Sequence, residues 1–162
     1  MVVSDTTALI ILAKSNTLFL LSNIFKTIYI PNAVYNELIV KDDIVKYRIK
    51  NFDKLKIKKV NNLKILKNIK KLNLDKGEIE AISLAIELNT ILIIDEKKGR
   101  KIALDKNLKI TGILGILIEN YKQKFLTLEE VKLYFYTFKN HGYRISEKLE
   151  DIFFKRLKSI DK

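Results

Sequence analysis

Short, continuously apolar segments alternate along the chain with longer stretches whose apolar residues recur at helical spacing. Residues 1–5 (MVVSD), 27–30 (TIYI), 90–95 (TILIID) and 109–113 (KITGI) are typical of strands that are apolar on both faces. Residues 43–60 are ambiguous, although LKIKKV within them is compatible with a short strand. Strands buried on both faces belong to parallel sheets that helices cover. The pattern therefore predicts an α/β fold of three layers, with a central parallel sheet flanked by helices.

The segments between and after these strands are predicted to be helical. Residues 8–25 (ALIILAKSNTLFLLSNIF) are expected to form one largely buried helix, because their apolar residues are too dense for a single face. Pro31 suits the start of a helix through NAVYNELI, and residues 75–88 (DKGEIEAISLAIEL) form the clearest helix. Further helices are indicated in NLKILKNIKKL, GRKIALDKNL, LGILIENYKQK, LTLEEVKLYFYTFKNH and SEKLEDIFFKRLK. We predict a single domain, residues 1–162, whose part from about 115 to 162 is a helical extension.

The composition bounds the class of protein. Hydrophobic residues make up 48% of the 162 residues, which is enough for the core of one ordinary domain. The absence of cysteine excludes disulfides and thiolate metal sites. The chain starts with a strand-like segment rather than a signal peptide, and its apolar stretches are too short to span a membrane. We therefore expect a cytoplasmic protein that does not enter membranes.

The charge is strongly basic, at +12, and most of the 31 basic residues are lysines. Such a charge attracts phosphate backbones, although a lysine excess also arises from coding bias across a genome. The segment 50–76 is dense in lysine, and within it we single out Lys64, Lys67, Lys70 and Lys71 as candidates for RNA contact. A solvated lysine-rich face is the alternative interpretation.

Two predicted strands end in an aspartate, Asp5 in MVVSD and Asp95 in TILIID. Ligands of open parallel sheets bind outside the carboxyl ends of the strands, so these two side chains are candidates for one site. Two carboxylates held together repel each other, and a bound divalent cation is the usual compensation. Each aspartate taken alone is also compatible with a turn or a helix cap.

Two glutamates on predicted helices are candidates for the same site. Glu37 follows Ala33 and Val34 by four and three residues, which places it near the apolar side of its helix. A surface glutamate at the edge of that side is the alternative. Glu78 and Glu80 both stand near the start of the helix over 75–88, but residues two apart point about 200° apart.

The apolar residues of that helix distinguish Glu78 from Glu80. Ile82 falls on the side of Glu78. Ser83 and Glu87 fall on the side of Glu80. We expect Glu80 itself to be solvated. An unpaired charge on the apolar side would be costly, and a bound cation would remove that cost. Glu78 is therefore the candidate ligand, and a helix-start acid that bends out to water is the alternative.

An ordered set of segments resembles the PIN-domain superfamily, in a branch similar to VapC-type toxin ribonucleases. The segments are VVSDTTALIILAK, YIPNAVYNEL, LDKGEIEAISLAIEL, LIIDEKKGRKIA, KITGILGIL and HGYRISEKL, and they cover nearly all of the chain. No single motif is decisive, so the resemblance depends on the ordered set. Ala8 departs from the branch, whose members often carry proline at that position.

The resemblance implies a PIN-like three-layer fold and a phosphodiesterase that cuts RNA with Mg²⁺ or Mn²⁺. It assigns the catalytic, metal-binding carboxylates to Asp5, Glu37, Glu78 and Asp95. It assigns auxiliary positions to Thr6, Thr7, Glu96 and Arg100. It also implies an RNA substrate, a small antitoxin protein as a possible partner, and a homodimer.

Other functions remain open at the level of the sequence. The chain could be an inactive PIN fold that binds RNA or protein, or a nuclease of the same fold that acts on DNA. An enzyme with Asp5 as phosphoryl acceptor is disfavoured, because Thr7 stands where such enzymes usually need a second aspartate. Cleavage by two histidines of one chain is excluded, since His141 is the only histidine; we expect it to be structural or exposed.

Overall fold

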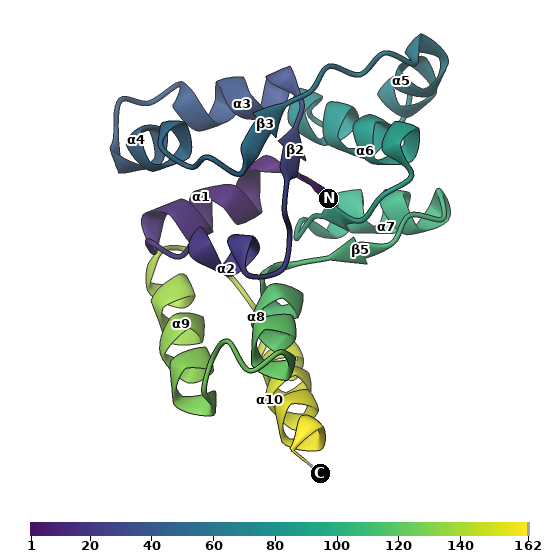
Figure 1. Ribbon diagram of the computed structural model, residues 1–162. Coiled ribbons are helices and arrows are strands. Elements are labelled where there is room, and N and C mark those ends of the chain that lie inside the picture. The colour runs from purple at the N-terminus through teal and green to yellow at the C-terminus, as the bar shows by residue number, and fades with distance from the viewer. Residues whose placement is uncertain (162) are drawn as a thin grey trace.

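A sheet of five short parallel strands lies at the centre of this computed structural model, which describes residues 1–161 (Figure 1). The strands are β1 (Val2–Ser4), β2 (Ile28–Ile30), β3 (Leu55–Ile57), β4 (Leu92–Ile93) and β5 (Ile110–Thr111). Their order across the sheet is β3-β2-β1-β4-β5, and every neighbouring pair is parallel. The predicted α/β fold is confirmed, and so is the short strand within the ambiguous segment.

The central strand β1 explains the apolar start of the chain. Val3 pairs with Tyr29 on one side and with Leu92 on the other. Val2, Val3 and Ser4 have no exposed surface. A strand that is paired on both edges and covered on both faces has no place for a charged side chain, so the first charge of this segment comes where the strand ends, at Asp5.

The chain changes direction across the sheet beside β1. From β1 it proceeds to β2 and β3 on one side, and it then crosses to β4 and β5 on the other side. The gap between the carboxyl ends of β1 and β4 is therefore the switch point, where open parallel sheets bind their ligands. Asp5 follows β1 there, and Asp95 follows β4 by two residues.

Helices fill the connections between the strands and the C-terminal part. They are α1 (Thr6–Lys14), α2 (Phe19–Ser22), α3 (Asn32–Ile39), α4 (Ile44–Lys50), α5 (Leu63–Lys70), α6 (Lys76–Leu88), α7 (Lys97–Asp105), α8 (Ile113–Lys122), α9 (Leu128–Asn140) and α10 (Glu147–Ile160). Helix α6 packs against both α3 and α5, and α1 packs against α3 and α4. In Figure 1, α3 to α6 lie together in the upper part, and α8 to α10 form a group below the sheet.

The single helix predicted over residues 8–25 is wrong, because the chain breaks between α1 and α2. Asn16 adopts a left-handed conformation with φ 55°, which asparagine tolerates better than most residues. The Thr17 N–H then donates to Leu12 O at 2.9 Å, and the Asn16 N–H donates to Ala13 O at 3.2 Å. These two hydrogen bonds, from the N–H groups that follow the helix back to its last turn, form a Schellman-type C-cap and end α1. The density of apolar residues in the sequence gives no sign of such a cap.

Other boundaries also differ from the prediction, and β4 and β5 are shorter than the strands predicted over 90–95 and 109–113. Helix α7 begins at Lys97 rather than at Gly99, because the Glu96 carboxylate caps it by accepting from the N–H groups of Lys98 and Gly99. The ambiguous segment 43–60 also contains a helix, α4, which Asp43 caps by accepting from the Lys46 N–H at 3.2 Å. Acidic caps of this kind are strong helix-start signals.

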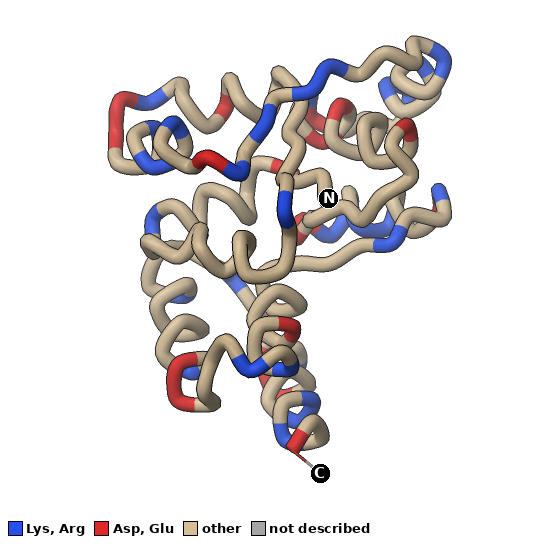
Figure 2. Tube along the Cα trace, viewed as in Figure 1, with Lys and Arg blue, Asp and Glu red and all other residues tan. Residues whose placement is uncertain are grey.

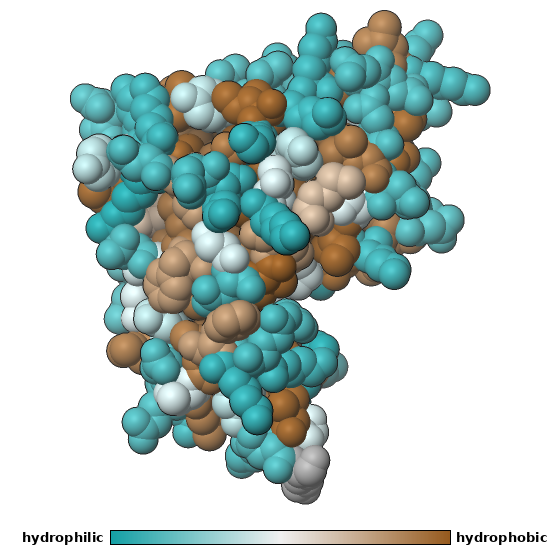
Figure 3. All heavy atoms as spheres, viewed as in Figure 1, coloured by the Kyte–Doolittle hydropathy of each residue, from teal (hydrophilic) through white to brown (hydrophobic). Residues whose placement is uncertain are grey.

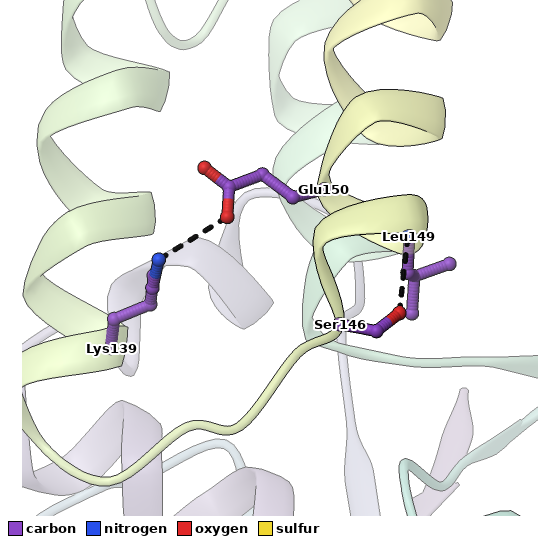
Figure 4. A network of polar contacts seen from close by, with 4 residues as sticks. All are labelled: Lys139, Ser146, Leu149 and Glu150. Atoms are coloured by element: carbon purple, nitrogen blue, oxygen red, sulfur yellow. Dashed lines mark hydrogen bonds and ion pairs between the residues drawn. The ribbon is translucent and has the colours of Figure 1, made fainter.

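The C-terminal part is helical, as predicted, and its buried residues belong to the same hydrophobic core as the rest of the domain. Phe135 and Phe138 of α9 are fully buried, and the Phe135 ring stacks on Phe153 of α10 with centroids 5.3 Å apart. At the surface, Lys139 pairs with Glu150 at 3.2 Å and so joins α9 to α10 (Figure 4). Ser146 caps α10 by accepting from the Leu149 N–H, also at 3.2 Å (Figure 4).

No helix within 1–161 combines the length and the apolar character needed to cross a bilayer. The face in Figure 3 is covered mainly by hydrophilic side chains, with hydrophobic ones scattered between them.

Candidate active site

Asp5 stands where β1 ends and α1 begins. Its N–H donates to Ile93 O at 3.0 Å, which ties it to β4. It occupies the N-cap position of α1, yet its side chain makes no capping hydrogen bond. Only 2% of the residue is exposed, and its Oδ1 has no hydrogen-bond partner. The Ala8 N–H, in the first turn of α1, lowers the pKa of Asp5, so the helix start acts on this carboxyl while its Oδ1 stays without a partner.

The environment of Asp5 disfavours its negative charge. Burial raises the pKa of this carboxyl well above its usual value, and the nearby charge of Asp95 raises it further. Glu78 and Asp75 act in the same direction. A buried carboxylate among other acids, with one oxygen left unpaired, is a position where a cation would be strongly favoured.

Glu37 reaches the site from α3. Its Oε2 accepts a hydrogen bond from the Thr6 hydroxyl at 2.5 Å, so the first turn of α1 orients it. The residue as a whole is exposed, as the alternative interpretation expected. Its carboxylate nevertheless turns toward Thr6 and toward Gly77 in the first turn of α6.

Glu78 belongs to a capping box at the start of α6. Asp75 Oδ1 accepts from the Glu78 N–H at 2.8 Å, and Glu78 Oε2 accepts from the Asp75 N–H at 3.2 Å. Burial raises the pKa of Glu78 to about 7, although the hydrogen bond from Asp75 opposes the shift. The carboxylate turns back to its own helix start rather than out to water.

Asp75 is a site residue that the sequence analysis missed. The signal was present, because an acidic cap followed three residues later by glutamate, as in DKGE, is a capping-box pattern. Asp75 and Glu78 thus place two carboxyl groups at one helix N-terminus, where the helix dipole favours negative charge.

The pocket at this point has a volume of about 250 Å³. It is lined by Asp5, Thr6, Thr7, Ile10, Glu37, Asp75 and Glu78. Of the predicted carboxylates it therefore brings three together. Glu80 does not line it, although Glu80 is half-buried rather than solvated. The assignment of Ser83 to a solvated side was wrong: Ser83 is fully buried, and its hydroxyl donates to Ile79 O at 2.6 Å.

Asp95 is held at the edge of the site by its own partners. Its Oδ2 accepts from the Ile113 N–H at the start of α8, at 3.1 Å. Burial raises the pKa of Asp95, whereas the Ile113 N–H, Arg100 and Tyr143 each lower it. Asp95 does not line the pocket, but its charge acts on Asp5. Tyr143 was missed as a site residue, although it lies in the segment HGYRISEKL.

The auxiliary residues have separate structural tasks. Arg100 donates to Ile94 O at 2.7 Å beside Asp95. Glu96 caps α7; burial opposes its ionisation, but the N–H groups of Gly99 and Lys98 hold the pKa of Glu96 below its usual value. Thr7 is exposed at the mouth of the pocket. His141 ends α9 and is exposed.

The donor chemistry of the pocket suits a hard cation. Every polar side chain that lines it offers oxygen, which is what Mg²⁺ and Mn²⁺ prefer. Within residues 1–161, however, no group of three or more His, Cys, Asp or Glu side chains is arranged to hold an ion. The two observations are compatible, because Mg²⁺ takes one or two carboxylates directly and keeps several waters.

The lysines of α5 lie on its surface. Lys64, Lys67, Lys70 and Lys71 are all exposed, and of the residues of α5 only Ile69 is buried. Figure 2 shows basic positions on the upper and the lower helices alike, so positive charge is not confined to α5.

Comparison with known proteins agrees with this architecture. No curated protein matches the chain. A family model described as DUF3368, a PIN domain, matches residues 1–159, which include the strands, the acidic pocket and nearly all of the C-terminal helices. With that match over almost its entire length, the chain belongs to the PIN-domain superfamily.

Proposed function

We propose that this protein is a metal-dependent endoribonuclease, and that it is the toxin of a VapC-like toxin–antitoxin pair. PIN domains are generally nucleases that need a metal ion. The observation that carries the proposal is the buried, unpartnered Oδ1 of Asp5 in an acidic pocket at the switch point of the sheet.

In this proposal Asp5, Glu37 and Glu78 are the carboxylates that would bind Mg²⁺ or Mn²⁺, one or two of them directly and the rest through water molecules of the ion. Asp95 acts from the edge of the site. The ion, when bound, lowers the pKa of a water molecule and stabilises charge on the phosphate. Thr6 keeps Glu37 turned inward through its hydrogen bond. The Ile113 N–H at the start of α8 donates to the Asp95 carboxylate. The charge of Arg100 lowers the pKa of Asp95, against burial, which raises it.

RNA is the proposed substrate, and the basic charge of the chain supports a polyanion in general. The antitoxin partner and the homodimer are proposed from the resemblance to VapC-type toxins. Co-purification of the protein with the product of an adjacent gene, and its mass in solution, test these two statements separately.

Two alternatives have support of their own. An inactive binding module is favoured by the lack of a preformed three-carboxylate group among the described residues. A DNA nuclease would use the same acidic pocket, because both substrates carry the same phosphodiester.

One experiment separates the three functions. Matched RNA and DNA oligonucleotides are incubated with the protein and Mn²⁺, Mg²⁺ or EDTA, and Asp5→Asn is the control. We expect metal-dependent cleavage of RNA, lost in the variant. Cleavage of DNA alone supports the second alternative. Binding of RNA without cleavage under every condition supports the first.

A further inference from the structure

Gly77 lies directly against the carboxylate of Glu37. A Cβ atom on Gly77 would stand 2.6 Å from Glu37 Oε1 and 3.0 Å from both Cδ and Oε2. These three atoms make up the carboxylate group, so any larger residue at position 77 would occupy its space. Gly77 is itself buried, in the first turn of α6.

Gly112 has the same relationship to Asp95. A Cβ atom on Gly112 would collide with Asp95 Oδ1 and would stand 3.0 Å from its Cγ. It would also lie 3.2 Å from Nη1 of Arg100. Gly112 is the N-cap residue of α8, whose next N–H, from Ile113, is the one that Asp95 accepts.

The backbone itself does not require glycine at either position. Gly112 has φ −129°, which any residue can adopt. Gly77 is helical, and alanine is a better helix former than glycine. The chain has only five glycines. At Gly99 the nearest atom is Cδ1 of Ile94 at 2.6 Å, and Glu96 Oε2 is in ordinary contact at 3.4 Å. At Gly115 the nearest neighbour is Thr111, and Gly142 faces open space. Carboxylates are thus the nearest neighbours only at Gly77 and Gly112.

We propose that Gly77 and Gly112 are positioning residues of the active site, each keeping open the space in which one carboxylate rests against the start of a helix. Glu37 then lies over the first turn of α6, and Asp95 over that of α8, where the helix N-terminus favours negative charge. The role in metal binding rests on the proposed function, whereas the steric relationship does not.

Gly77→Ala tests the role in metal binding. The carboxylate is the flexible end of Glu37, so it should move and leave the helix intact. We expect the metal-free protein to melt no lower than wild type, because alanine favours the helix. We expect the Kd for Mn²⁺, measured by calorimetry, to rise about tenfold or more, as for other residues that orient a metal ligand. Gly115→Ala is the control, since its methyl group would collide with the Thr111 hydroxyl rather than with a carboxylate.

Rescue by a shorter acid distinguishes positioning from a general packing effect. Glu37→Asp should weaken Mn²⁺ binding in the wild type, because the carboxylate retracts. In the Gly77→Ala background, Glu37→Asp should weaken Mn²⁺ binding less than it does in the wild type, because the shorter side chain avoids the clash with the new methyl group. Purely additive losses, or wild-type Mn²⁺ affinity in Gly77→Ala, would overturn the proposal.

A double-mutant cycle on the melting temperature of the metal-free protein tests the steric relationship independently of the proposed function. Gly77→Ala should raise the melting temperature more in a Glu37→Ala background than in the wild type, because the methyl group then meets no carboxylate. Gly112→Ala and Asp95→Ala form the equivalent cycle at the second site. Equal shifts in both backgrounds refute the steric relationship. If the wild type binds no Mn²⁺ while the shifts differ, the proposed nuclease function is wrong and the steric relationship stands.

Discussion

Glu78 and Asp75 exchange hydrogen bonds at the start of α6, the Glu78 N–H donating to Asp75 Oδ1 at 2.8 Å and the Asp75 N–H donating to Glu78 Oε2 at 3.2 Å. The exchange fixes the Glu78 carboxylate beside its own helix start and keeps a second acid next to it. The charge of Asp75 raises the pKa of both Glu78 and Asp5, whereas the hydrogen bond from the Asp75 N–H lowers the pKa of Glu78. The start of α6 thus acts on the charge of the pocket.

Asp5→Asn should abolish metal-dependent cleavage and raise the melting temperature of the metal-free protein. The reason is that burial, the neighbouring charge of Asp95 and the unpaired Oδ1 all make the ionised form of Asp5 costly in the folded state. The shift should be several degrees, since 1 kcal/mol corresponds to about 2–4 °C in a chain of this size. Calorimetry with and without millimolar Mn²⁺ measures both effects, because a metal that binds the native state stabilises it. A variant that melts lower and keeps its Mn²⁺ response would make Asp5 a structural residue.

The stability of the metal-free protein should depend on pH near neutrality. Burial raises the pKa of Glu78 to about 7 in the folded state, above its ordinary value, so the folded state binds the proton more tightly. The stabilisation from this proton is present at low pH and is lost as the pH rises through about 7. The melting temperature should therefore fall as the pH rises from about 4.5 to about 7 in the wild type, and less steeply in Glu78→Gln. Identical slopes for the two proteins would contradict the assignment.

Glu78→Gln and Glu80→Gln should separate the two glutamates of α6. Glu78 lines the pocket and Glu80 does not. Glutamine can still accept the capping hydrogen bond from the Asp75 N–H, so the fold of Glu78→Gln should persist. Its cleavage rate should fall by about 100-fold or more, at or beyond the upper end of the loss that follows when a residue orienting a metal ligand is changed. Glu80→Gln should cleave at nearly the wild-type rate. Circular dichroism checks the fold of both, and a greater loss in Glu80→Gln would mean that the pocket is not the active site.

Local patterns predicted the strands and most helices because burial in this fold follows the sequence closely. MVVSD and TILIID stop at their aspartates, since the sheet interior accepts no charge. The break after α1 was not predictable from apolar density. It depends on the left-handed conformation of Asn16, a choice made by one residue inside an apolar run.

The candidate site was only partly accessible from the sequence. The helical phase predicted correctly that Glu78, rather than Glu80, faces the pocket. It did not predict that Ser83, on the side of Glu80, is buried, because α6 packs between α3 and α5 and is covered around more of its circumference than a surface helix. Tyr143 could not be found by spacing. It comes from the loop before α10, and only the packing of the C-terminal helices brings it to Asp95.

The lysines of α5 allow a direct test of RNA binding by this helix. The quadruple change to glutamine at Lys64, Lys67, Lys70 and Lys71 should weaken RNA binding and flatten its dependence on salt. Each lysine that meets a phosphate releases counterions on binding, so the slope of log K against log salt should decrease by about 0.7 for every phosphate of a single strand that the variant no longer neutralises. The measurement is fluorescence anisotropy with a labelled RNA in EDTA, which prevents cleavage.

A charge-matched variant decides whether location matters. Lys132, Lys148, Lys155 and Lys158 are exposed on α9 and α10, and their replacement by glutamine removes the same total charge. If α5 contacts the phosphate backbone of the RNA, the α5 variant should show a shallower slope of log K against log salt, while the C-terminal variant keeps the wild-type slope. The reason is that only groups close to phosphates displace condensed counterions. Equal losses in both would assign the effect to net charge, which acts over the whole surface. An unchanged slope in the α5 variant would make that helix a solvated face, and the RNA would then have to approach the acidic pocket along another surface.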